Sequence, residues 1–120
     1  MNPLPIDPER LEREWEADLD VLASLAANGD RPEIARPVDV NFRGSPEALA
    51  ALEERAAEFG FVVLETEPSA DGDPCLFLER SQKADEASIR ALTETCLQIE
   101  LIFGLEYEGW GCVAETGLIH

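Results

Sequence analysis

Cysteine and histidine are the first residues to consider for chemistry, because a thiolate beside an imidazole base makes a nucleophile. The chain holds three cysteines, Cys75, Cys96 and Cys112, and one histidine, His120, at its last position. A terminal residue frays and is not readily fixed beside a thiol. The number of cysteines is odd, and their positions do not have the spacing of metal ligands. We therefore expect free, buried thiols and no nucleophilic catalysis.

Paired carboxylates are the second candidate for chemistry. Asp71-Gly72-Asp73 places two acids in one turn, but Gln82 stands where a calcium-binding EF-hand loop starting at Asp71 needs a bidentate glutamate. The many other acid pairs do not single out a general acid and base. No glycine motif that would hold a phosphate is present. We predict a plain turn here, no metal or other cofactor, no catalytic residue, and a protein that is not an enzyme.

Acidic residues dominate the composition of this chain. Its 120 residues include 26 Asp and Glu against 9 Lys and Arg, which gives a net charge of −17. Phosphate backbones and anionic lipid surfaces repel such a protein, so we expect no direct nucleic-acid or membrane binding. The N-terminus has neither a basic flank nor an apolar stretch, and no apolar run approaches about 18 residues. These features predict a cytoplasmic protein.

The acids concentrate in two regions. Seven lie within residues 7–20, and no Lys or Arg follows Arg90. Such surfaces steer basic partners, although an acidic surface also serves solubility alone. We predict that both regions help to bind a basic protein segment. The acids of the first region, here named the acidic ridge, are Asp7, Glu9, Glu12, Glu14, Glu16, Asp18 and Asp20. The candidate partner-binding residues are Glu12, Glu16, Asp20, Glu106, Glu108 and Trp110.

The string Tyr107-Glu108-Gly109-Trp110-Gly111 is the most unusual in the chain. Glycines on both sides of Trp110 favour a bend that folds the indole over the core, but they are also compatible with an exposed aromatic residue that binds a partner. An acidic face with Trp110 exposed would favour a protein partner. A closed apolar pocket around Trp110 would favour the alternative functions, a small-ligand-binding or structural interaction module.

These residues must be positioned by regular elements, and the first expected element is a helix over residues 7–28. Asp7 is suited to cap it, Pro8 to occupy its first position, and Asn28-Gly29 to end it. Its apolar residues recur every three or four positions and predict a buried stripe. The stripe consists of Leu11, Trp15, Leu19, Leu22 and Ala26.

The rest of the chain alternates between strand and helix patterns. Residues 38–43 alternate between apolar and polar, as a half-buried strand does, and a helix capped by Ser45 should run to Phe59. Residues 61–66 and 75–80 should pair as a hairpin. A helix should then run from Asp85 to Phe103. A last strand should start at Leu105, be interrupted or bulge at the glycines, and resume over residues 112–114.

The predicted order, one helix followed by β-α-β-β-α-β, is typical of a ferredoxin-like α+β sandwich with an additional N-terminal helix. The second and third helices should cover one face of the sheet, with the strands from Val38 and Leu105 as neighbours in its centre. We expect residues 1–120 to form one domain, with residues 1–6 and 116–120 flexible.

Several of these strings together resemble the RraB family. The resemblance rests on residues 38–42, on residues 45–63, on the preceding acidic helix, and on Tyr107, Gly109, Trp110 and Gly111; it covers roughly residues 8–115. It implies a ferredoxin-like, non-catalytic, acidic bacterial protein of the cytosol. Such a protein would bind the scaffold region of ribonuclease E, inhibit the enzyme and slow the decay of some transcripts. We expect it to be a monomer.

Overall fold

Helices and strands alternate along the computed structural model, which describes residues 4–69 and 72–117. They form an α+β fold in which three α-helices accompany a four-stranded antiparallel sheet across those residues. The elements are α1 (Pro8–Ala27), β1 (Arg36–Arg43), α2 (Pro46–Arg55), the 3₁₀ helix η1 (Ala56–Phe59), β2 (Val62–Glu67), β3 (Cys75–Gln82), α3 (Glu86–Phe103) and β4 (Glu106–Gly111).

The starts of α1 and α2 follow the predicted caps, and α3 starts beside Asp85, where a helix was predicted to start. The side chains of Asp7, Ser45 and Asp85 accept hydrogen bonds from backbone N–H groups of the first turns of α1, α2 and α3. These bonds satisfy donors that a helix start leaves unpaired. The end of α3 was also predicted correctly, because Gly104 adopts the left-handed conformation with φ of 68°.

The second helix is shorter than predicted. It ends at Arg55, and the chain tightens into η1 before Gly60. The N–H of Phe61 then donates to the carbonyl of Ala56 at 3.0 Å, which turns Phe61 into the core, where it is buried. The α-helix α3 closes with the same bond, from the N–H of Leu105 to the carbonyl of Glu100, so the chain turns at Gly60 as predicted and only the last turn before it is tighter than an α-helix.

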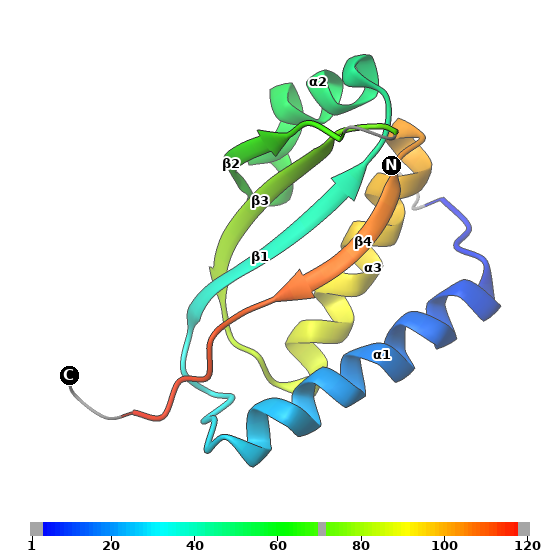
Figure 1. The fold of residues 1–120 in the computed structure, drawn as a ribbon. Helices are drawn as coiled ribbons and strands as arrows, with labels where there is room; N and C mark the ends of the chain where they lie inside the picture. Colours follow the sequence, from blue (N-terminus) through cyan, green and yellow to red (C-terminus); the bar gives the residue numbers. More distant parts are fainter. Residues whose placement is uncertain (1–3, 70–71, 118–120) are drawn as a thin grey trace.

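The sheet has the strand order β2-β3-β1-β4, and all its neighbouring strands are antiparallel. The hairpin of β2 and β3 is confirmed, and β1 and β4 are neighbours. The prediction that β4 lies in the centre of the sheet is wrong, because β1 and β3 occupy the two central positions. Figure 1 shows the four strands with α3 on the far side of them.

The predicted continuation of the last strand over residues 112–114 is also wrong. Pairing between β1 and β4 stops at Asp39 and Gly111. Two residues before Asp39 on β1 stands Pro37, which has no N–H to donate to a ladder. The backbone beyond Gly111 instead meets the preceding loop, because the N–H of Glu115 donates to Asp30 Oδ1 at 2.7 Å.

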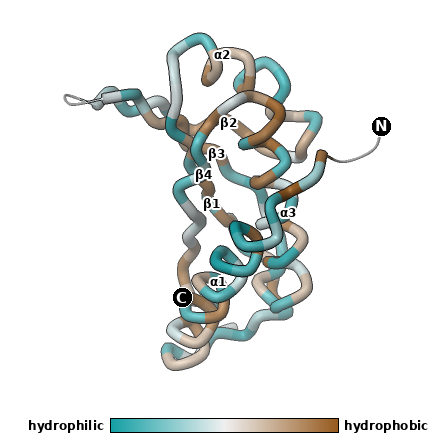
Figure 2. The backbone as a smooth tube through the Cα atoms, turned by 90° about the vertical axis from the view of Figure 1, so that its right-hand side faces the viewer, coloured by the Kyte–Doolittle hydropathy of each residue, from teal (hydrophilic) through white to brown (hydrophobic). Residues whose placement is uncertain are grey.

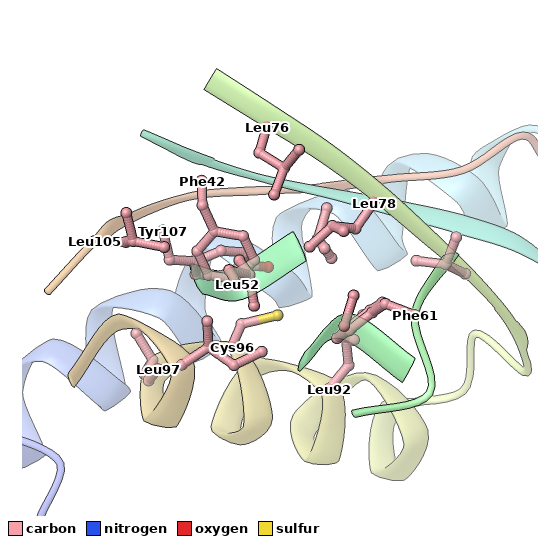
Figure 3. Packing of buried hydrophobic residues seen from close by; sticks show 14 of the residues in the cluster. Phe42, Leu52, Phe61, Leu76, Leu78, Leu92, Cys96, Leu97, Leu105 and Tyr107 are labelled. Carbon is pink, nitrogen blue, oxygen red and sulfur yellow. The ribbon is translucent and has the colours of Figure 1, made fainter. Parts of the chain in front are cut away.

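The core lies between the sheet and the helices α2 and α3. Strands β1 and β3 contribute Phe42, Leu76 and Leu78, which point toward Leu92 and Cys96 of α3 in Figure 3. The ring of Phe42 also packs against that of Tyr107, with centroids 5.4 Å apart. Helix α1 lies outside this sandwich and packs chiefly against α3, beside which it runs in Figure 2.

The segments near the chain ends were expected to be flexible. The backbone of Leu4 exchanges two hydrogen bonds with the side chain of Gln98 on α3, which attaches the segment before α1. Residues 1–3 and 118–120, where we also expected flexibility, lie outside the described residues. No helix within residues 4–69 and 72–117 is long and apolar enough to cross a membrane.

Replacing a leucine between sheet and helix should cost far more stability than replacing one on the edge strand. Leu92→Ala removes a fully buried side chain and should lower the free energy of unfolding by about 2–5 kcal/mol. Leu64→Ala, at a residue 48% exposed, should change it by less than about 0.5 kcal/mol. Urea denaturation followed by tryptophan fluorescence measures both, and equal losses would contradict this placement of the core.

Candidate protein-binding surfaces

A buried carboxylate joins α1 to α3 and β4. Asp18 is only 3% exposed. Thr93 of α3 donates its hydroxyl to Oδ2 at 2.5 Å, and the indole N–H of Trp110 donates to Oδ1 at 2.8 Å. None of the ion pairs within the described part of the chain includes Asp18. Burial therefore raises the pKa of this carboxyl, and the two hydrogen bonds only partly oppose the rise.

A bulge in β4 brings Trp110 to this carboxylate. Phe42 pairs with Tyr107 and Val40 with Trp110, so three residues of β4 span the length of two on β1. Gly109 in the bulge has φ of 131°, which side chains rarely allow. The extra residue points Tyr107 and Trp110 toward the same face. Trp110 is half-buried against the core, with its only polar atom bound to Asp18.

The hydrogen bonds that Asp18 accepts from Thr93 and Trp110 determine which side of α1 faces inward. Two expectations about this helix, its buried apolar stripe and the place of Asp18 in the acidic ridge, are therefore wrong. Asp18 and Leu25 are the buried residues of α1, whereas Leu19 of the predicted stripe is 47% exposed and Ala26 is exposed. Asp18 thus belongs to the interior and not to the acidic ridge. Glu14 of the ridge is half-buried and pairs with Arg10.

The first acidic surface follows the groove between α1 and the beginning of α3. Two adjoining cavities of about 460 and 350 Å³ share Leu19 and make up this α1–α3 groove. Exposed Glu12 and Glu16 line the larger cavity. The one cation lining it is Arg90, whose guanidinium lies 4.1 Å from the ring centre of Trp15. The remaining lining is largely apolar.

Asp20 lies apart from that groove. It lines a shallow groove of about 640 Å³ between α1 and the segment that follows β4, together with Cys112 and Val113. The structure therefore divides the predicted residues of α1 between two neighbouring grooves on either side of the helix.

The second acidic surface is the open face of the sheet, which we define as the face opposite the core. Because Val38, Val40 and Phe42 are buried, strand alternation turns the intervening residues of β1 outward. Glu79 faces Asp39 across β1 and β3, and the two line a groove of about 470 Å³. Figure 1 views this face, in front of which no helix is drawn.

Glu106 and Glu108 belong to this open face. Glu106 lies opposite Arg43 in the β1–β4 pairing, and Glu108 accepts a hydrogen bond from Arg43 Nε at 2.5 Å. Both glutamates are exposed. Glu12 and Glu16 lie instead at the α1–α3 groove. The structure does not gather the predicted acids into one surface.

Trp110 lines none of the four grooves described here. Its indole N–H is taken by Asp18, and the residue is half-buried. It therefore neither walls one of these four cavities nor presents a free donor to a partner.

The cysteines show no sign of an activated nucleophile. All three are free, and burial raises the pKa of each thiol. Cys75 and Cys96 are buried, but Cys112 is half-buried, so the expectation that all three are buried is wrong for Cys112. Within residues 4–69 and 72–117, no three His, Cys, Asp or Glu side chains gather to hold a metal ion. Asp71 of the turn that we predicted to be plain lies outside the described residues.

Sequence reasoning missed the buried polar residues. The signal for Asp18 was present, since it stands seven residues after Leu11 and seven before Leu25, on the same side of a helix. Arg36 was missed as well. Its fully buried guanidinium pairs with Asp30 at 2.7 Å and donates to the carbonyl of Arg31. It lies two residues before Val38, so strand alternation alone places it on the inward face.

The free energy of unfolding should depend on pH through the titration of Asp18. Because its pKa is raised in the folded state, the carboxyl adds stability below its ordinary value of 3.8, and this stability is lost as pH rises through the folded value. Asp18→Asn removes the titration, while its amide still accepts from Trp110 and donates to Thr93. Urea unfolding from pH 4 to pH 8 should show that the stability of Asp18→Asn, relative to that of the native protein, increases as pH rises. A difference independent of pH would contradict the raised pKa.

Asp18→Ala serves as the second variant in this experiment. It leaves the hydroxyl of Thr93 and the indole N–H of Trp110 without their partner, so it should be less stable than Asp18→Asn by about 1–3 kcal/mol at neutral pH. Equal stability of the two variants would mean that the hydrogen bonds contribute nothing.

Comparison with known protein families shows which family this chain belongs to. A family model described as regulator of ribonuclease activity B matches residues 15–112, from Trp15 of α1 to the residue after β4. A comparison with curated proteins finds no match. The family match covers most of the 120 residues and includes Asp18, Thr93 and Trp110. This chain therefore belongs to the RraB family, the regulators of ribonuclease activity B.

Proposed function

We propose that this protein binds and inhibits a ribonuclease E-type endoribonuclease and so modulates mRNA decay, without catalysing a reaction itself. The observation that carries the proposal is the family match over residues 15–112, whose description is that of a ribonuclease regulator. The bound element is a basic segment of the enzyme's scaffold region. The element order and the strand order β2-β3-β1-β4 support a ferredoxin-like sandwich as the frame for this binding.

The charges supply a physical mechanism for inhibition. Segments of an RNA-processing enzyme that contact RNA or partner proteins are rich in Lys and Arg. A protein of net charge −17 attracts such segments and occupies the surface that RNA would otherwise meet. In this proposal the regulator acts as a monomer in the cytoplasm and competes through charge.

The two acidic surfaces are not equally suited to this role. On the open face of the sheet, Glu108 is already paired with Arg43. At the α1–α3 groove, none of the ion pairs described in the structure engages Glu12 or Glu16, and the guanidinium of Arg90 lies over Trp15. We therefore assign the larger share of the binding to the α1 side.

The rival function, binding of a small ligand around Trp110, has less support. A ligand site needs a concave apolar cavity with free polar groups. Trp110 lines none of the four grooves described above, and its N–H is committed to Asp18.

The direct test is binding and inhibition with purified components. The protein should bind a purified scaffold fragment of a ribonuclease E-type enzyme and slow cleavage of a model transcript by the full-length enzyme, but not by the catalytic domain alone. Absence of binding at low ionic strength would overturn the proposal, as would cleavage of RNA by the regulator itself.

Two charge-reversal pairs separate the surfaces. Glu12→Lys with Glu16→Lys, and Glu106→Lys with Glu108→Lys, each change the net charge by the same amount, from −17 to −13. Because exposed charges act mainly on association rate, the α1 pair should slow association with the scaffold fragment about tenfold at low salt. The sheet pair should slow it about twofold. Stopped-flow or biosensor kinetics measure both rates, with circular dichroism as the control for folding.

Ionic strength provides the second arm of this experiment. The Debye length falls from about 8 Å at 0.15 M to about 3 Å at 1 M, so salt should remove much of the rate advantage of the native protein. Equal slowing by both pairs would indicate attraction by net charge alone. Association indifferent to the reversals and to salt would contradict the electrostatic account.

A further inference from the structure

The α1–α3 groove exists because α1 is rolled to bury Asp18. The two hydrogen bonds to Asp18 turn the helix so that Leu25 faces inward. The apolar stripe expected from the sequence is then only partly covered, and Leu19 is left 47% exposed. Leu19 lies where the two cavities of the groove meet. Part of the apolar stripe therefore faces the groove without a partner from this chain.

The rim of the groove is acidic except at Arg90, whose guanidinium lies over the ring of Trp15. Glu12 and Glu16 lie on the α1 side, and Glu86 lies on the α3 side. The lining residues run along α1 from Pro8 to Ala26, which corresponds to about 27 Å at 1.5 Å per residue. The apolar floor of this groove suits a protein segment that has one apolar face. The carboxylates at the rim suit Lys and Arg on both sides of that face.

We propose that the α1–α3 groove binds a basic amphipathic helix of a protein partner, with Leu19 packing against the apolar face of that helix. A helical partner segment fits best because most of the groove is lined by helix residues, chiefly of α1, whose backbone groups are bonded internally; Asp30, Pro32, Ala84 and Asp85 of the neighbouring loops complete the lining. An extended peptide would find few main-chain partners there, whereas a helix satisfies its own. A third helix packs between two others by ordinary ridge-and-groove contacts.

A second copy of this chain is a poorer occupant. Both copies would carry a net charge of −17 and present glutamates at the rim, and like charges across an interface repel. The inference relies on the proposed function only for the identity of the natural partner. The class of segment follows from the groove itself.

The test uses a synthetic probe that needs no ribonuclease. An 18-residue peptide of Lys and Leu, with the leucines at helical spacing, is compared with an isomer of the same composition in which Leu and Lys alternate. By calorimetry the helical pattern should bind at least about tenfold more tightly than the isomer. Circular dichroism should show helix formation on binding. Amide and indole NMR signals should shift at Trp15 and Leu19, and not at Asn41 or Gly109 of the open sheet face.

Matched variants report on Leu19 directly. Leu19→Arg and Leu64→Arg add the same charge at residues 47% and 48% exposed, one in the groove and one on β2. Leu19→Arg should weaken binding of the helical peptide at least about tenfold, and Leu64→Arg less than about twofold. Both sites are well exposed, so unchanged urea midpoints serve as the control for folding.

The outcomes separate this inference from the proposed function. Equal binding of the two peptides, equal effects of the two arginines, or NMR shifts confined to the sheet would overturn the groove proposal. Binding of the helical peptide in the groove, with no binding of a ribonuclease scaffold fragment, would support the groove and reject the enzyme as partner. Binding of the scaffold fragment unaffected by Leu19→Arg would keep the function and reject the groove.

Discussion

A buried carboxylate that has no cation beside it in the described part of the chain governs the arrangement of this protein. Removing Asp18 from water is unfavourable unless its oxygens find donors, and Thr93 and Trp110 provide them from two different elements. The requirement acts on three elements at once. It sets the roll of α1, demands a hydroxyl on the facing side of α3, and needs a bulge in β4 that turns the indole inward.

Polar contacts also attach α1 at its two ends. Near its start, Arg10 bonds to Glu100 of α3 at 2.9 Å and to the carbonyl of Tyr107. Beyond its end, the buried pair of Asp30 and Arg36 fixes the loop that leads into β1. The helix is thus held by directed bonds along its length, while the apolar core lies between the sheet and the other two helices. Directed bonds favour one roll of a helix over others, whereas an apolar stripe alone tolerates several.

The parts of the structure that could be predicted are those governed by local patterns. Caps such as Asp7 and Ser45, the alternation of β1 and the span of α3 each depend on neighbours in sequence, and they are present as predicted. The roll of α1 could not be read this way, because the position of Leu19 depends on donors more than 70 residues away from Asp18. The sites were predicted least well for the same reason. Glu12 and Glu106 are both exposed acids, but nothing in their local sequence says that they lie on different faces.

The few buried contacts of α1 make this helix the first element expected to detach in partial unfolding. Segments with few buried apolar contacts form the least stable cooperative units of a protein, and their amides exchange with solvent through partial unfolding. Only Asp18 and Leu25 are buried in α1, whereas α3 buries six residues. Amides of α1 should therefore exchange through undocking of this helix while those of β1 and β3 remain protected. Undocking would also dismantle one wall of the groove, so whatever occupies the groove would slow amide exchange along the whole helix.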